Sequence, residues 1–248
     1  MKIAARKIAG NLANFARPLF SLLYPPCCEG CGAGVEYPRY LCEQCAAAAV
    51  RIKEPFCKVC SEPFQGSIPG AFTCANCADR KFHFICAVAR YRSTGVVRDF
   101  IHRFKYWREF HLRHPLAAWA AEALEDDRIR ELRVDALVPV PLFVARERHR
   151  EFNQAAELAR LVGAGAGLAV SDCLLRTRNT TSQLTYDRAG RMENLRNAFR
   201  MRQNSVVRGL HLVLVDDVLT TGSTLDECAR VLLEAGAASV RGITVARG

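Results

Sequence analysis

The sequence predicts an α/β fold: an open, mostly parallel sheet flanked by helices, preceded by a small cysteine-rich module. Two observations lead to this prediction. Apolar runs that suit buried strands alternate with amphipathic segments that suit helices, which is the pattern of parallel α/β sheets. Four C-x-x-C pairs crowd residues 27–80, which is typical of a metal-held module. The expected strands cover residues 86–92, 135–142, 212–215 and 240–245.

Length and composition agree with one ordinary domain plus a smaller module. The chain has 248 residues, half of them apolar, and a formal net charge of +10. That charge favours polyanionic partners such as nucleotides, pyrophosphate or nucleic acid. No run of 18 apolar residues predicts a membrane span and no signal-peptide core is evident, so we expect a cytoplasmic protein.

Three segments are expected along the chain: an amphipathic lead over 1–26, the cysteine module over 27–84 and the α/β domain over 85–248. The lead carries basic residues and no acid. We expect it to form a helix packed on the body of the protein. A mitochondrial targeting helix has the same composition and is the alternative.

The cysteine pairs favour metal over disulfides, because no secretory signal precedes them. Each C-x-x-C pair presents two thiolates from one tight turn, which is half of a tetrahedral site. Ten residues separate Cys31 from Cys42 and thirteen separate Cys60 from Cys74, so each gap suits a short hairpin. Two structural zinc sites are the simplest prediction, because four thiolates leave no open position. A crossed pairing, first pair with third, is the alternative; an iron–sulfur cluster or a redox dithiol fits less well. The predicted ligand sets are Cys28, Cys31, Cys42 and Cys45, and Cys57, Cys60, Cys74 and Cys77.

Residues 98–113 interleave basic and aromatic side chains. Five Lys or Arg stand against two acids. Basic residues with stacking rings suit single-stranded nucleic acid or a flat base. The alternative, which we place slightly ahead, is an amphipathic helix whose aromatic residues enter the core. The aromatic residues are Phe100, Phe104, Tyr106, Trp107 and Phe110.

The segment after the strand 135–142 is strongly basic, whereas residues 115–132 before it are expected to form one polar-faced helix. An open α/β sheet binds ligands beyond the carboxyl ends of its strands, so residues 140–154 should face the ligand crevice. Arg146 and Arg150 are candidates there for binding pyrophosphate, because guanidinium forks match phosphate oxygens. A solvated helix start is the alternative.

Residues 176–195 are polar and basic, and we expect a long mobile loop that closes over the site and excludes water. Long irregular loops inside compact domains are uncommon without a function. Arg176 and Arg178 at its start are further candidates for pyrophosphate. The alternative is a surface loop without a functional role.

The stretch 212–224 carries the strongest functional signal. An apolar run, 212–215, is followed at once by two acids and then by a turn rich in hydroxyls that opens a helix. Backbone N–H groups at a helix N-terminus favour phosphate, whereas an acidic pair suits sugar hydroxyls or a divalent cation. Together they predict binding of a ribose 5-phosphate. The alternative is a helix capped by Ser223 or Thr224 after a buried strand.

The same stretch resembles the loop that binds phosphoribosyl pyrophosphate (PRPP) in type I phosphoribosyltransferases. The resemblance implies a fold of that type and a magnesium-dependent reaction. In that family the acids hold the 2- and 3-hydroxyls of the ribose and the loop cradles its 5-phosphate. By resemblance, Asp216 and Asp217 are the catalytic residues, and the phosphate is bound by Thr220, Thr221, Gly222, Ser223 and Thr224.

Nearly the whole chain from Tyr24 onward resembles the ComF family, which combines a double zinc ribbon with a phosphoribosyltransferase-like domain. ComF proteins are associated with DNA uptake in natural competence. The family usually has a glycine where this chain has Glu151, which weakens the expectation that this turn wraps pyrophosphate. The matching segments include Phe104–Tyr106, Val138–Leu142, Arg150–Gln154, Leu158–Ala159 and Arg188–Arg191.

Two hypotheses follow from the resemblance. The first is a magnesium-dependent phosphoribosyltransferase that moves ribose 5-phosphate from PRPP to an acceptor the sequence does not identify. The second is an accessory protein without catalysis, which senses PRPP or binds single-stranded DNA. A competence helicase or related uptake proteins are the candidate protein partners in either case.

Overall fold

The computed structural model describes residues 26–36, 39–64, 66, 68, 72–178 and 195–248. Nearly all of the predicted lead and most of the predicted closing loop lie outside these residues. The chain divides into two compact units, Met1–Ala49 and Val50–Gly248. The second group of four cysteines therefore belongs to the same unit as the sheet.

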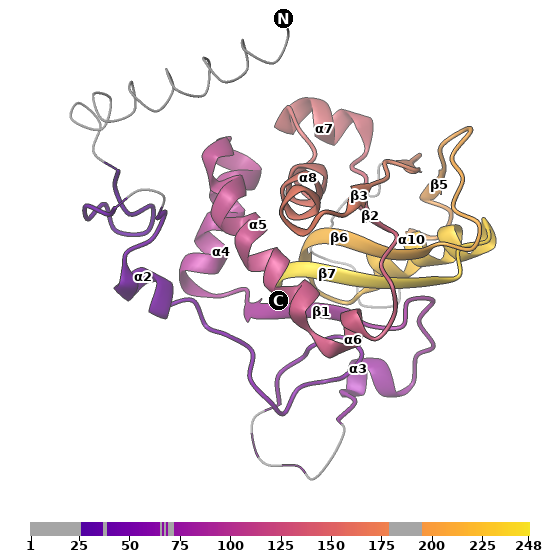
Figure 1. Ribbon diagram of the computed structural model, residues 1–248, viewed down its shortest axis with the longest axis horizontal. Helices are drawn as coiled ribbons and strands as arrows, with labels where there is room; N and C mark the ends of the chain where they lie inside the picture. The colour runs from indigo at the N-terminus through magenta and orange to yellow at the C-terminus, as the bar shows by residue number, and fades with distance from the viewer. Residues whose placement is uncertain (1–25, 37–38, 65, 67, 69–71, 179–194) are drawn as a thin grey trace, which may run out of the picture. The chain divides into compact units, whose positions relative to one another are not determined.

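The larger unit contains a five-stranded sheet in which every pair of neighbours is parallel. Figure 1 shows the two long strands, β6 and β7, at its middle. This arrangement confirms the predicted open parallel sheet. From one edge to the other, the strands are β1 (Ala87–Arg92), β7 (Ser239–Arg247), β6 (His211–Leu219), β2 (Ala136–Pro139) and β3 (Ala169–Val170).

A separate antiparallel ladder joins β4 (Leu174–Arg176) and β5 (Phe199–Met201). In it, Arg176 pairs with Phe199, so the chain on either side of the predicted closing loop is held together at its base.

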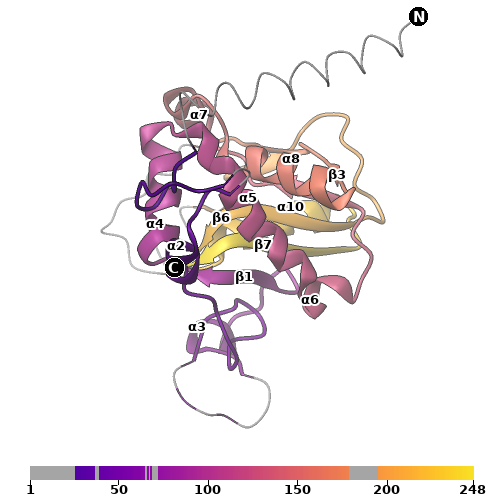
Figure 2. The same ribbon diagram turned by 60° about the vertical axis from the view of Figure 1, so that its left-hand side comes forward.

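Helices connect the parallel strands. Figures 1 and 2 show α5 and α8 lying side by side against the sheet. The helices are α4 (Gly95–His102), α5 (Arg113–Ala121), α6 (Asp127–Arg130), α7 (Val144–Arg150), α8 (Gln154–Ala166) and α10 (Ser223–Glu234). Shorter turns are the π-helix η1 (Arg103–Trp107) and the 3-10 turns η2 (Phe110–Leu112) and η3 (Glu122–Glu125).

The sheet buries both faces, as parallel sheets do. Leu212 and Leu214 of β6 share a core cluster with Leu225 of α10. On the neighbouring strand, Leu137 lies 3.7 Å from the place a side chain would take at Gly163 of α8. Because successive strand residues point to opposite faces, α10 and α8 cover different sides of the sheet.

Two elements differ from the sequence prediction. The helix expected over 115–132 is broken into α5, η3 and α6, because Asp126 leaves the helical conformation and its carboxylate caps Arg128 N. Five of the nine residues of α5 are buried, so it is less polar than expected. The strand expected to end at Val215 continues through both acids to Leu219.

The smaller unit contains the first cysteine group and the short helix α2 (Glu43–Ala47), whose N-cap is Cys42. The corresponding helix of the second group is α3 (Ala75–Ala78), capped by Cys74. Each helix therefore begins at the third cysteine of its group, which places the fourth cysteine one turn further on.

Candidate functional site

The two acids of the candidate site lie inside β6, where pairing with β7 continues past them to Leu219, whereas pairing with β2 ends at Val215. Asp216 pairs with Thr244 of β7, and its Oδ1 accepts a hydrogen bond of 2.9 Å from the backbone N–H of Asp217. As successive strand residues, the two carboxylates leave the backbone on opposite sides. The two carboxylates therefore point toward different faces of the sheet.

Asp217 is held by a residue from a distant part of the chain. The Nζ of Lys105, in η1, lies 2.6 Å from Asp217 Oδ2, and the two side chains are only 18% and 13% exposed. A π-helical turn places this lysine, and such turns are frequent at functional sites. Lys105 was not among the predicted site residues, although it lies in the Phe104–Tyr106 segment that carried the resemblance.

Asp216 has an environment of its own. The pKa of its carboxyl is raised to about 7, chiefly by burial and then by the neighbouring charge of Asp217. The charges of Lys105 and Arg176 act in the opposite direction. One carboxylate of the pair is thus neutralised by an ion pair, whereas the other is poised to change its protonation near neutral pH.

The turn after β6 opens α10 as predicted, with Gly222 as its N-cap. Gly222 has a φ of +77°, which favours glycine. The N-cap residue is this glycine, so the alternative of a helix capped by Ser223 or Thr224 is wrong, and Thr221 Oγ1 accepts a hydrogen bond of 3.4 Å from Ser223 N. Thr221 Oγ1 and Ser223 Oγ also lie 3.0 Å apart and bond each other.

A small hollow of about 20 Å³ lies at this turn. Asp216 lines it together with residues of the predicted phosphate loop: Thr220, Gly222, Ser223 and Thr224. The loop and the first acid therefore share one concave surface, which is open to solvent at Thr220. A larger pocket of about 430 Å³, between α5 and α8, is lined by none of the predicted site residues.

Two of the four predicted arginines come together near the acids. Burial lowers the pKa of Arg176, and the nearby charge of Arg146 lowers it further. The Asp216 carboxylate acts on the same guanidinium and favours its charged form. Arg176 also pairs through its backbone with Phe143, the residue before α7, so Arg146 and Arg176 form a positive cluster that suits an anion of high charge, and Asp216 acts on its Arg176 member.

The other two predicted arginines are engaged elsewhere. Arg150 lies over the ring of Tyr106, 5.1 Å from its centroid, and donates a 3.1 Å hydrogen bond to Gln154. Arg178 donates to the backbone carbonyl of Arg196 at 3.3 Å. The structure therefore does not bring these two guanidinium groups into the Arg146 and Arg176 cluster.

Glu151 occupies a left-handed turn at the end of α7, with a φ of +69°. This is a conformation that favours glycine, the residue usual in the resembling family. The Glu151 carboxylate lies 2.7 Å from Arg108 Nη1. Arg108 also has a left-handed backbone, so two strained residues contact each other through their side chains.

The aromatic stretch at 98–113 divides between core and surface. Phe100 and Phe104 are buried, as the helix alternative predicted. Tyr106 and Trp107 are 57% and 64% exposed, and His102 packs against both rings. The helical alternative thus holds for the first half of the stretch, whereas an exposed aromatic pair remains in the second half.

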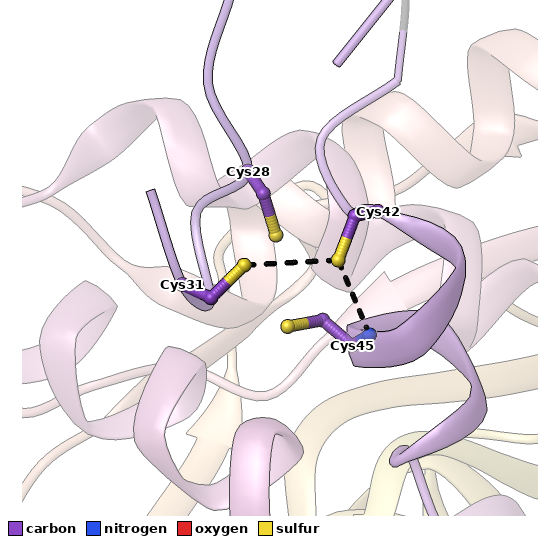
Figure 3. A group of neighbouring side chains, drawn as sticks. All are labelled: Cys28, Cys31, Cys42 and Cys45. Carbon is purple, nitrogen blue, oxygen red and sulfur yellow. Dashed lines mark hydrogen bonds between the residues drawn. The ribbon is translucent and has the colours of Figure 1, made fainter. Parts of the chain in front are cut away.

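The eight predicted metal ligands form two groups of four. In each group the sulfur atoms all lie within 4.8 Å of one another. Figure 3 shows the side chains of the first group directed toward a common centre. There, Cys31 Sγ and Cys42 Sγ are 3.7 Å apart, and Cys42 Sγ accepts from Cys45 N at 3.4 Å. The structure has the sequential pairing, and the crossed alternative is wrong.

The second group is buried, and its thiols interact strongly. The S–H of Cys60 lowers the pKa of Cys57 to about 4, and the Cys57 thiolate in turn raises the pKa of Cys60. Four sulfur donors at this spacing fit a tetrahedral ion with a preference for thiolate, which is the chemistry of structural zinc. Bound zinc would hold all four thiolates and release their protons.

The chain matches two family models, a double zinc ribbon domain over residues 19–80 and a phosphoribosyl transferase domain over 127–248. The DNA utilization protein YhgH of Salmonella typhimurium is 35% identical over 207 residues, covering 81% of this chain and 87% of that protein. Competence protein F of Haemophilus influenzae is 28% identical, covering 79% and 87%.

The fold and the site thus define a protein with a type I phosphoribosyltransferase-like domain and a double zinc ribbon. The chain belongs to the ComF family. Competence protein ComFC of Bacillus subtilis is also similar, 38% identical over 45% of this chain and 44% of that protein. Among the described residues, no helix combines the length and the apolar character of a membrane span.

Proposed function

We propose that the protein binds PRPP and, with magnesium, transfers its ribose 5-phosphate to an acceptor. The observation that supports this most is the shared hollow of Asp216 and the loop Thr220–Thr224, beside the cluster of Arg146 and Arg176. Sugar hydroxyls, a phosphate and a pyrophosphate are the three groups that these surfaces would recognise. The ligand class is the one that the phosphoribosyl transferase family model implies.

Each surface has a distinct task in this proposal. The backbone N–H groups at the start of α10 hold the 5-phosphate, and Asp216 and Asp217 accept hydrogen bonds from the ribose hydroxyls. Arg146 and Arg176 hold the pyrophosphate and stabilise it as it leaves. Magnesium, when bound, would supply charge to the pyrophosphate and ribose oxygens.

The reaction exchanges one bond at C1 of the ribose. The bond from C1 to the pyrophosphate oxygen breaks, and pyrophosphate leaves with the electron pair. Positive charge develops on the sugar, where the carboxylates of Asp216 and Asp217 oppose it. A nitrogen nucleophile of the acceptor then forms the new bond to C1 and releases its proton to water.

The test is calorimetric titration of the full chain with PRPP and magnesium chloride. We expect saturable binding that Asp217→Asn weakens at least tenfold. Asp172→Asn is the matched control, since Asp172 is an exposed acid paired with Arg202 away from β6. No binding by the wild type, or equal binding by Asp217→Asn, would exclude the proposal. Release of pyrophosphate with a panel of nucleobases then separates a transferase from a protein that only senses PRPP.

Single-stranded DNA is a second candidate ligand, which the exposed pair Tyr106 and Trp107 favours. Arg150 already stacks on Tyr106, and Arg108 lies next to Trp107 in sequence, so rings and positive charge occur together. The relatives named for competence and DNA utilization support a ligand of this class. A competence helicase or another uptake protein is the corresponding partner, and the thiolate sites fit the cytoplasmic location expected from the sequence.

Fluorescence anisotropy with a labelled oligo-dT tests the second candidate. We expect affinity that falls steeply with salt and drops at least tenfold in the double variant Tyr106→Ala, Trp107→Ala. Phe64→Ala, an exposed aromatic residue of the second ribbon, is the control. Affinity that is unchanged by the double variant would exclude this surface as the binding site.

A further inference from the structure

The segment Arg80–Phe84 follows the last cysteine of the second group and contacts the predicted phosphate loop directly. Arg80 Nη1 donates a hydrogen bond of 3.2 Å to the backbone carbonyl of Thr221. The backbone N–H of Arg80 in turn donates to the carbonyl of Cys77. One arginine thus joins the cysteine turn to the middle of the loop.

Two rings of the same segment pack against the loop backbone. Phe82 and Phe84 stack on each other with their centroids 4.6 Å apart. A side chain added at Gly222 would meet the Phe82 ring at 3.3 Å and the Phe84 ring at 3.4 Å. The loop therefore turns with its glycine against these rings, and the Arg80 guanidinium lies over the Phe82 ring as well.

The first turn of α10 is anchored by His83 of the same segment. His83 donates its backbone N–H to Asp226 Oδ1 at 2.6 Å, and His83 Nδ1 lies 3.0 Å from the same oxygen. Arg80–Phe84 thus holds the phosphate loop at two points: Arg80 binds the Thr221 carbonyl, and His83 binds the helix that follows the loop.

The cysteine group supports this segment from the other side. All four of its cysteines belong to the same buried cluster as Phe84 and Leu225 of α10. Arg128 donates to the carbonyls of Cys57 and Lys58, which ties the first turn of this group to α6. The second ribbon is therefore built into the domain that carries the site.

We propose that Arg80 is a positioning residue for the 5-phosphate of the ligand, and that the second ribbon forms one wall of the phosphate loop. The inference rests on the proposed function and deepens it. Arg80 holds the Thr221 carbonyl away from the hollow, so that the N–H groups of the loop face the phosphate. A ligand that carries a 5-phosphate depends on Arg80, whereas pyrophosphate alone, bound at Arg146 and Arg176, does not.

The experiment compares ribose 5-phosphate and pyrophosphate as calorimetric probes of the full chain. In Arg80→Ala we expect the affinity for ribose 5-phosphate to fall about tenfold, with pyrophosphate affinity unchanged. Arg80→Lys, which can still donate to the carbonyl, is expected to recover part of the loss. Lys81→Ala is the matched control, because it removes one positive charge from an exposed neighbour and leaves the contacts intact.

The outcomes separate this inference from the proposed function. If the wild type binds PRPP and Arg80→Ala binds ribose 5-phosphate as tightly, the inference is wrong and the proposed function stands. If Arg80→Ala loses both probes equally, the role of Arg80 is general folding, which also overturns the inference. Zinc content and the thermal midpoint of each variant are measured alongside, so that a variant that has lost the ribbon is recognised.

Discussion

Lys105 Nζ and Asp217 Oδ2 lie 2.6 Å apart, in a largely buried ion pair that joins η1 to the strand of the acidic pair. The lysine neutralises the charge of Asp217, which reduces the repulsion between the two adjacent carboxylates in the free protein. It also fixes the direction of Asp217, because the salt bridge restricts the rotamers of both side chains. The site is therefore organised by a residue more than one hundred positions away in the sequence.

Removing this lysine should destabilise the protein. Lys105→Met leaves the Asp217 carboxylate partly buried without its cation, so we expect the free energy of unfolding to fall by about 1–3 kcal/mol. Urea denaturation at pH 8 measures the change. A double-mutant cycle with Asp217→Asn should give a coupling of about 1 kcal/mol or more, and a coupling near zero would contradict the ion pair.

The raised pKa of Asp216 predicts how stability changes with pH. Its carboxyl titrates near pH 7 in the folded protein against an ordinary value of 3.8, so its favourable contribution is complete below pH 3.8 and is lost as pH rises through 7. Asp216→Asn removes this loss. Relative to wild type, the variant should gain stability between pH 4 and pH 8, by roughly 4 kcal/mol at the upper end, because each pKa unit of the shift corresponds to about 1.4 kcal/mol. Chemical denaturation across this range gives the difference, and a difference independent of pH would refute the assignment; Asp172→Asn is the exposed control.

Zinc content should follow the two cysteine groups. We expect two zinc ions per chain, and one each in Cys31→Ser and Cys60→Ser, because a lost thiolate opens the tetrahedral site. Inductively coupled plasma mass spectrometry counts the metal. Cys27→Ser is the control, since Cys27 lies next to Cys28 and outside both groups, and it should keep two ions. Loss of both ions in either single variant would show that the sites do not load independently.

The left-handed turn at Glu151 makes a prediction about backbone conformation. At a φ of +69°, glycine is unstrained, whereas a β-branched residue is strongly disfavoured. Glu151→Gly should therefore keep the wild-type stability within about 1 kcal/mol, while Glu151→Val should lose about 2 kcal/mol. Thermal unfolding of the pair measures this. Equal losses would indicate that the Arg108 salt bridge, which both variants lack, is what matters at this position.

The sheet and the turn that opens α10 could be predicted because their signals are local. The apolar run before Asp216 and the hydroxyl-rich turn after it identified strand, loop and helix without any knowledge of the rest. The end of β6 was missed, since aspartate is rare in strands and the apolar pattern stops at Val215. The structure extends the strand because Asp216 still pairs with Thr244 of β7.

The contacts that complete the site could not be predicted, because they join segments far apart in the chain. Nothing near Lys105 shows that it will meet Asp217, and nothing near Arg80 shows that it will meet Thr221. The arginines illustrate the same limit. Arg146, Arg150 and Arg176 are equally basic in sequence, yet Arg150 stacks on Tyr106, whereas Arg176 interacts with both Arg146 and Asp216.

The short ladder of β4 and β5 has a consequence for how this family can vary. Because Arg176 pairs with Phe199, the two ends of the segment between them are fixed beside each other, whatever the number of residues between. Lengthening a loop whose ends are fixed costs little free energy, about 0.6 kcal/mol for each doubling of its length. Insertions or deletions between β4 and β5 should therefore leave the strands that carry the acids undisturbed.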